Sequence, residues 1–163
     1  MKLFTVSFFG HRIVSEFREA EGRVEALIHT LLLENEYVEF LVGRNGDFDQ
    51  IVTSVVKRQQ RRVRDDNSAL IWILPYPTAE LRDNLESFEA YYDEIEICEA
   101  ASRSHPKSAI QIRNQQMVDR SDLVVFYVDH SSGGAYQTLR YAQRKNKALL
   151  NLAYFRRDRR ELL

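Results

Sequence analysis

Three short polar segments stand where an apolar run gives way to a helical pattern, and their residue types suit the binding of an anion. They are Gly-His-Arg at 10–12, Gly-Arg-Asn-Gly-Asp at 43–47 and Ser-Ser-Gly-Gly-Ala at 131–135. Glycine lets the backbone approach a ligand closely, and the first amides of a helix have no intrahelical partner and attract phosphate. Arg12 and Arg44 add guanidinium groups that form paired hydrogen bonds to phosphate or carboxylate. A simple turn explains any one segment, whereas the three together favour a ligand site.

A fourth candidate, Arg113 followed by Asn114, interrupts the apolar face of a predicted helix. A guanidinium at the edge of a core needs a fixed partner, because leaving that charge unpaired costs several kcal/mol. Two kinds of partner are open: a ligand anion, or a neighbouring carboxylate such as Asp119 or Asp122. The ligand is the favoured interpretation.

Asp47 and Asp49 are candidates for binding ribose hydroxyls. For Asp47 a structural role is at least as good an explanation, because Asp47 followed by Gln50 has the spacing of a helix capping box.

Metal and hydrolase chemistry are not expected. The four histidines, His11, His29, His105 and His130, show no metal-ligand spacing, and the single cysteine provides no cluster. Ser131 and Ser132 lack the flanking G-x-S-x-G pattern of a nucleophile elbow. We therefore expect no metal, no cofactor and no Ser-His-Asp triad.

The elements that must position these residues alternate between strand and helix. The sequence predicts helices around 24–32, from Asp47 through 56, from Thr78 through 88, around Arg113, and over 135–145, with strands at 3–9, 38–42, 69–74, 93–97, 123–128 and 148–153. Such alternation predicts an α/β fold, a three-layer, Rossmann-like open sheet, mainly parallel, with helices on both faces. Ligands of these sheets bind outside the carboxyl ends of the strands, where the three glycine segments would meet.

Length, composition and net charge limit the number of domains and the kinds of partner that the protein can bind. With 163 residues, 44% of them hydrophobic, the chain is the size of one domain, and we expect a single domain over 1–163. The net charge of −1 gives no field toward nucleic acid or membrane, and no apolar run is long enough to span a bilayer. The start lacks a signal-peptide pattern, so we expect a cytoplasmic protein. A basic run at 57–64 is the local exception, and Arg156–Arg160 reads as a solvated tail.

The motifs in this order resemble the SLOG group, which unites the DNA-processing protein A and Lonely Guy proteins. The resemblance rests on Phe-Phe-Gly-His-Arg at 8–12, Gly-Arg-Asn-Gly-Asp-Phe-Asp at 43–49, Arg113-Asn114 with Met117 and Asp122, and Ser-Gly-Gly-Ala at 132–135. It covers nearly the whole chain and is strongest toward the short YpsA-like branch. It implies a Rossmann-like domain that binds a nucleotide or nucleotide-derived ligand, such as an ADP-ribose-like molecule, as a homo-oligomer.

Lonely Guy enzymes cleave the bond between base and ribose phosphate with an arginine like Arg113 and a P-G-G-x-G-T-x-x-E turn. Here that turn reads Ser-Gly-Gly-Ala-Tyr-Gln-Thr-Leu-Arg over 132–140, without the proline and with Arg140 at its end. Cleaving an N-glycosidic bond builds positive charge on the sugar, which a carboxylate stabilises and an arginine does not. The sequence keeps the phosphate turn and loses the motif glutamate.

The leading hypothesis is therefore a binding protein for sensing or regulation. The alternatives are a nucleoside-phosphate N-glycosidase or transferase, and single-stranded DNA binding through the basic run. The candidate ligand-binding residues are Gly10, His11, Arg12, Gly43, Arg44, Asn45, Asp47, Arg113, Asn114, Ser132, Gly133, Gly134, Ala135 and Thr138.

Overall fold

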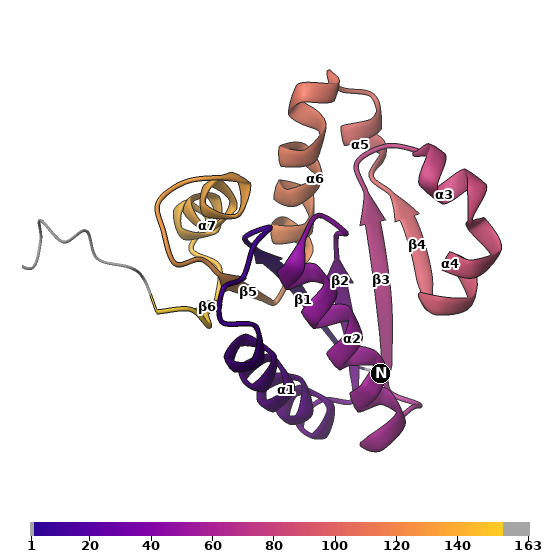
Figure 1. Ribbon diagram of the computed structural model, residues 1–163, viewed down its shortest axis with the longest axis vertical. Coiled ribbons are helices and arrows are strands. Elements are labelled where there is room, and N and C mark those ends of the chain that lie inside the picture. The colour runs from indigo at the N-terminus through magenta and orange to yellow at the C-terminus, as the bar shows by residue number, and fades with distance from the viewer. Residues whose placement is uncertain (1, 155–163) are drawn as a thin grey trace, which may run out of the picture.

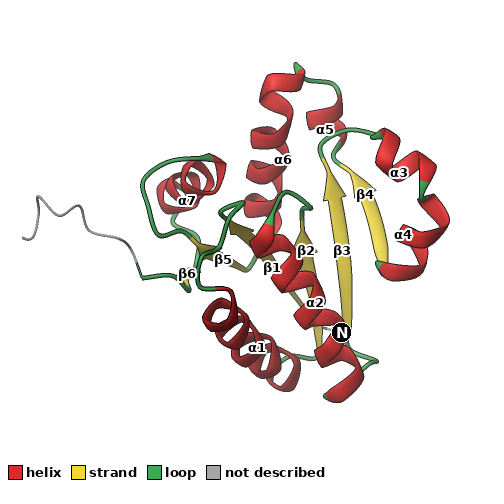
Figure 2. Cartoon of the chain, in the orientation of Figure 1, coloured by secondary structure: helices red, strands yellow, loops and turns green. Residues whose placement is uncertain are grey.

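A computed structural model describes residues 2–154 and shows a six-stranded, entirely parallel sheet with helices on both faces (Figure 1, Figure 2). The strands are β1 (Leu3–Gly10), β2 (Tyr37–Val42), β3 (Ser68–Leu74), β4 (Glu94–Ile97), β5 (Leu123–Tyr127) and β6 (Leu149–Asn151). The helices are α1 (Phe17–Glu34), α2 (Asp47–Arg62), α3 (Ala79–Asp83), α4 (Leu85–Tyr91), α5 (Glu99–Ser102), α6 (Pro106–Arg120) and α7 (Gly134–Arg144). The predicted Rossmann-like α/β architecture is confirmed. The expected tail at Arg156–Arg160 lies outside the described residues.

The strand order is β4-β3-β2-β1-β5-β6. Strands β1 to β4 step outward in one direction, and the chain then returns to place β5 on the other side of β1. Parallel crossovers are right-handed, so this reversal sends the helices on its two sides to opposite faces of the sheet. The gap that opens between β1 and β5 at their carboxyl ends is where such sheets bind ligands.

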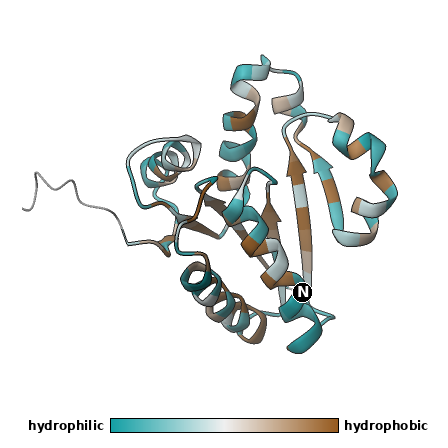
Figure 3. Cartoon of the chain, viewed as in Figure 1, coloured by the Kyte–Doolittle hydropathy of each residue, from teal (hydrophilic) through white to brown (hydrophobic). Residues whose placement is uncertain are grey.

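Each face of the sheet has its own apolar core because side chains alternate along a strand. The neighbours Phe8 and Phe9 of β1 belong to different cores: Phe8 packs against Phe40 at 6.1 Å between ring centroids, and Phe9 against Phe126 at 5.8 Å. Buried residues of α1 and α2 complete the first core, and those of α6 and α7 complete the second. Figure 3 shows the consequence, hydrophobic strands between helices that alternate hydrophobic and hydrophilic residues. No helix within 2–154 has the length and apolar character to cross a membrane.

The helix predicted from Thr78 through 88 is interrupted. Thr78 does cap it, accepting a hydrogen bond from the Leu81 amide at 3.1 Å. At Asn84 the chain leaves helical geometry, and the Asn84 side chain donates to the Glu80 carbonyl at 2.9 Å. An asparagine side chain competes in this way for helix carbonyls, so two short helices replace one.

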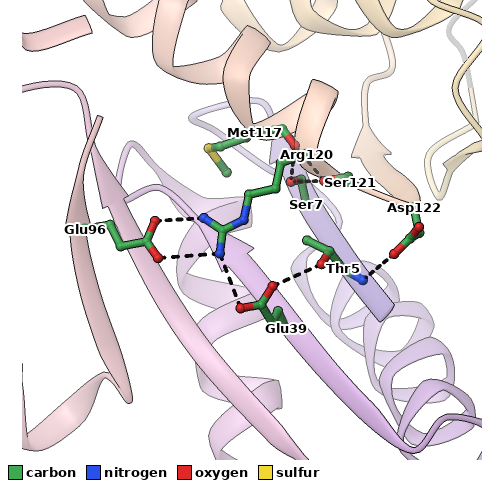
Figure 4. A network of polar contacts seen from close by, with 8 residues as sticks. All are labelled: Thr5, Ser7, Glu39, Glu96, Met117, Arg120, Ser121 and Asp122. Atoms are coloured by element: carbon green, nitrogen blue, oxygen red, sulfur yellow. Dashed lines mark hydrogen bonds and ion pairs between the residues drawn. The ribbon is translucent and has the colours of Figure 1, made fainter. Parts of the chain in front are cut away.

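Arg120 fastens the last turn of α6 to strands β2 and β4 of the sheet (Figure 4). Its guanidinium donates to Glu96 of β4 at 2.8 Å and to Glu39 of β2 at 3.3 Å, spanning β3. Arg113 lies about two turns earlier on the same helix, so this anchor helps set where Arg113 points.

A second set of bonds joins the end of α6 to β1 (Figure 4). Buried Ser7 and Ser121 both donate to the Met117 carbonyl, at 3.2 and 2.7 Å. The Thr5 amide donates to the Asp122 carboxylate at 2.8 Å. Asp122 therefore binds the backbone of β1 and is not the partner of Arg113, one of the possibilities that the sequence analysis left open.

The end of β1 packs so closely against α2 that residue 10 must be glycine. A Cβ at Gly10 would lie 2.3 Å from Cγ of Phe48, which is fully buried and stacked on Tyr127. We predict that Gly10→Ala lowers the free energy of unfolding by about 1–3 kcal/mol, because an extra carbon in a filled core forces strain. Urea denaturation measures this change.

Gly22 provides the matched control. It is exposed on α1, and a Cβ there would meet nothing within 4 Å. Gly22→Ala should leave stability unchanged or raise it by about 0.5–1 kcal/mol. Equal stability of Gly10→Ala and wild type would contradict the packing argument.

Candidate functional site

A cavity of about 480 Å³ opens at the carboxyl edge of the sheet, beside the gap between β1 and β5. Its wall comes from the ends of β1 and β2, the middle of α6 and the loop that precedes α7. All but three of the candidate residues line it: Gly10, His11, Arg12, Gly43, Asn45, Arg113, Asn114, Ser132, Gly133, Gly134 and Ala135. The three glycine segments, remote in sequence, thus face one hollow.

The glycine turn before α7 leaves the start of that helix without a side-chain cap. Gly133 has φ +91°, a conformation that residues with a side chain rarely adopt. The first amides of an uncapped helix carry partial positive charge and have no intrahelical acceptor. This turn has the geometry of an anion-binding helix start, and it borders the cavity.

Thr138 supports the turn instead of lining the cavity. It is fully buried, donates to the Gly134 carbonyl at 2.9 Å and accepts a hydrogen bond from the Asn114 amide group at 3.1 Å. Through these two hydrogen bonds Thr138 joins α6 to α7.

Arg113 is the largest fully buried side chain of the described residues, with 2% of its surface exposed. Its Nε donates to the Asn114 side chain at 2.9 Å, and its Nη1 donates to the Ile73 carbonyl at 2.8 Å. A Cβ at Gly43 would lie 3.4 Å from Nη2, so glycine makes room for the guanidinium at the cavity wall. Burial lowers the pKa of Arg113, an effect that the charge of Asp49 opposes.

Neither carboxylate suggested by the sequence is the partner of this arginine. Asp119 accepts from the Tyr141 hydroxyl at 2.8 Å, and Asp122 from β1, as above. The compensation comes from a backbone carbonyl, an amide and the charge of Asp49, none of which helical spacing indicates.

Asp49 is the buried acid of the site, with 9% of its surface exposed, and it lines the cavity. Its Oδ2 accepts from the Asn45 amide at 2.8 Å. Burial raises the pKa of Asp49 to about 6, although the Asn45 hydrogen bond and the charge of Arg113 both favour the ionised form.

Asp47 does not line the cavity, contrary to its place among the candidate ligands. Its carboxylate accepts from the Val14 amide at 2.9 Å, and its own amide donates to the Arg12 carbonyl at 2.8 Å. The predicted capping box with Gln50 does not form, because Gly46 holds the cap position and no side chain caps α2. Asp47 instead holds the loop after β1 in place.

Arg44 points away from the cavity into a neighbouring hollow of about 170 Å³ that Tyr91 and Tyr92 also line. Its Nε donates to Glu80 at 3.2 Å, and its guanidinium lies 5.1 Å from the centre of the Phe88 ring. The prediction of Arg44 as a ligand of the same site is therefore not supported by its position.

The cavity wall also contains residues that were not among the candidate ligand-binding residues. Phe8, Phe9, Ile13 and Ile110 supply apolar surface, and His130 stacks on His11 with 3.7 Å between ring centroids. His130 follows the predicted strand 123–128 by two residues. It could have been found from the sequence, because ligands of such sheets bind outside the carboxyl ends of the strands. Nothing in the sequence marked the four apolar residues as part of the cavity wall.

The basic run at 57–64 lies at the other rim. Helix α2 starts at the carboxyl edge and ends where β3 begins, at the amino edge (Figure 1). Arg58 forms ion pairs with Glu21 and Glu25 at 3.7 and 3.6 Å, and Arg64 pairs with Asp66 at 2.7 Å. Much of this charge is therefore engaged within the fold and remote from the cavity.

Solved structures of DNA processing protein A have a similar fold. The X-ray structure of DNA processing protein A (DprA) from Streptococcus pneumoniae has a TM-score of 0.66 and 14% identity, covering 90% of this chain and 49% of that one. DNA processing protein A from Helicobacter pylori, described for its single-stranded DNA binding mode, has a TM-score of 0.60 and 15% identity, with 90% and 63% covered. The chain thus spans less than two thirds of either protein. No protein-family model and no curated protein matches the sequence. The likeness to these two structures shows that the chain shares their fold.

The pKa of Asp49 predicts a pH dependence of stability. Between about pH 4 and 6 the folded protein holds a proton that the unfolded chain has released, so stability should fall as pH rises through this window. The loss should reach up to about 3 kcal/mol in the wild type and be absent in Asp49→Asn. Urea unfolding at pH 4 and pH 7 measures it for both proteins. Parallel profiles would contradict the buried acid.

Proposed function

We propose that the cavity binds a nucleotide or a nucleotide-derived ligand of ADP-ribose type, and that this binding serves sensing or regulation. The observation that carries the proposal is the meeting of three glycine segments around one hollow that also contains Arg12 and the uncapped start of α7. A volume of about 480 Å³ suits a ligand of this size.

The cavity lining contains groups suited to the phosphate, the base and the ribose of such a ligand. Phosphate oxygens would accept from the amides at Gly133 and Gly134 and from Arg12, which is exposed at the cavity. The base would pack on the apolar side chains of Phe9 and Ile110. The carboxylate of Asp49, which lines the cavity, would accept a hydrogen bond from a ribose hydroxyl.

The surroundings favour binding over chemistry. Arg113 already donates to Ile73 and Asn114, so its role is to hold the wall and its positive field in place. Arg140, at the place of the Lonely Guy glutamate, lies outside the cavity wall and is exposed. With the motif resemblance, we further infer a protein of the YpsA-like branch that acts as a homo-oligomer.

Isothermal titration against nucleoside mono-, di- and triphosphates, NAD and ADP-ribose tests the proposal. At least one phosphate-bearing ligand should bind, and Arg12→Ala should weaken it about 10–100-fold, since a charge-assisted hydrogen bond contributes about 1.5–3 kcal/mol. Arg82→Ala is the control, because Arg82 is exposed on α3 outside both hollows. Absence of binding across the panel, or equal losses in both variants, would overturn the proposal.

A nucleoside-phosphate N-glycosidase or transferase is the alternative for the same cavity. The feature in its favour is Asp49, the buried carboxylate that could stabilise positive charge on a sugar. Release of free base from a nucleoside monophosphate in the titration mixtures would assign this activity.

Single-stranded DNA is the second candidate ligand, favoured by the Helicobacter pylori protein with this fold. If the basic run carries it, replacing exposed Arg61 and Arg62 by alanine should reduce the salt slope of oligonucleotide binding by about 0.7 for each charge. Fluorescence anisotropy with a labelled oligothymidine measures this slope. An unchanged slope, with binding lost in Arg12→Ala, would move the nucleic acid to the cavity instead.

A further inference from the structure

His11, Asp129 and His130 form a compact cluster at the rim of the cavity. His11 Nε2 lies 3.4 Å from Asp129 Oδ1, and His130 Nδ1 lies 2.6 Å from the same oxygen. The two imidazole rings stack almost in parallel, with 11° between their planes. Within residues 2–154 this is the one group of three histidine, cysteine or acidic residues whose ligand atoms lie close enough to share an ion, all within 4.8 Å.

The sheet topology forces this meeting. Gly10 and Tyr127 are register partners on the neighbouring strands β1 and β5, so His11 follows one strand and Asp129 and His130 follow the other. The His11 amide donates to the Tyr127 carbonyl at 3.3 Å. The ligand spacing that the sequence analysis sought along the chain is therefore present across two adjacent strands.

Asn151 of β6 fixes the direction in which the chain leaves β5. Its side chain accepts from the Val128 amide at 3.0 Å and donates to the Val128 carbonyl at 2.9 Å. With both polar groups of Val128 held, the next residue, Asp129, is placed toward His11. The site is thus supported by backbone on both sides.

The donor atoms suit a transition metal better than Mg²⁺ or Ca²⁺, because two of the three are imidazole nitrogens. His11 Nε2 accepts from the Asp129 amide at 3.2 Å, so a bound ion must replace this hydrogen bond. An imidazole binds a metal in the plane of its ring, so the exposed His130 must also turn out of the parallel stack on His11 to reach the same ion. Ligand bonds of about 2.0–2.2 Å place neighbouring donor atoms roughly 3–3.5 Å apart. The 3.4 Å separation already meets this spacing, and the 2.6 Å contact must lengthen by less than about 1 Å.

We propose that His11 Nε2, Asp129 Oδ1 and His130 Nδ1 bind a divalent first-row transition metal ion. Three protein ligands leave at least one coordination position open, the arrangement of reactive or ligand-binding metal sites rather than closed structural ones. His11 and His130 both line the cavity, so the open position faces it. If the proposed nucleotide function holds, a phosphate oxygen is the natural occupant of that position.

Titration of untagged, EDTA-stripped protein with Zn²⁺ and Co²⁺ alone tests this site. We expect one ion per chain and visible Co²⁺ absorption bands. Asp129→Asn and His130→Ala should each weaken Zn²⁺ binding by at least about tenfold, the smallest loss found for residues that merely support a metal ligand. His29→Ala, at an exposed histidine of α1, should bind as the wild type does.

Circular dichroism melts establish that each variant is folded before titration. The proposal is overturned if folded wild type shows no Co²⁺ bands and no Zn²⁺ binding, or if Asp129→Asn and His130→Ala bind like His29→Ala. No nucleotide is present in this experiment, and the nucleotide titrations are repeated in EDTA. Failure of the metal site is thereby distinguished from failure of the proposed function.

Discussion

The parallel pairing of β1 with β5 is the constraint on which the rest of the structure depends. It reverses the strand order, and right-handed crossovers then place α1 and α2 on one face and α6 and α7 on the other. The cavity opens between these layers, at the carboxyl ends of the two strands. The same pairing brings His11 beside Asp129 and His130 although 118 positions separate the first two.

Two buried charges shape that cavity from within. Arg113 and Asp49 lie on opposite elements, α6 and α2, and each influences the pKa of the other. Neither forms a direct ion pair among the described residues. Burial raises the pKa of Asp49 and lowers the pKa of Arg113, so it favours the neutral form of each side chain. Buried charges compensated only by hydrogen bonds and by each other's field are unfavourable for folding alone, and groups of this kind cluster at functional sites.

The fold followed from the sequence because alternating apolar strands and amphipathic helices admit few parallel arrangements. The strand-end rule also brought Gly10, Gly43 and Gly133 to one cavity. The sequence did not predict the directions of two side chains. Arg44 donates to Glu80 outside the cavity, and Asp47 accepts from the Val14 amide. These choices depend on packing between distant segments, which local spacing does not contain.

The amide signals of the glycine turn test the central claim most directly. In ¹⁵N-resolved NMR spectra, adding ADP-ribose should shift Gly133, Gly134 and Ala135 together with Gly10 and Gly43, because one ligand would touch all three strand ends. Shifts confined to 57–64, or none at the glycine turn in the presence of a ligand that binds, would contradict a shared anion-binding cavity.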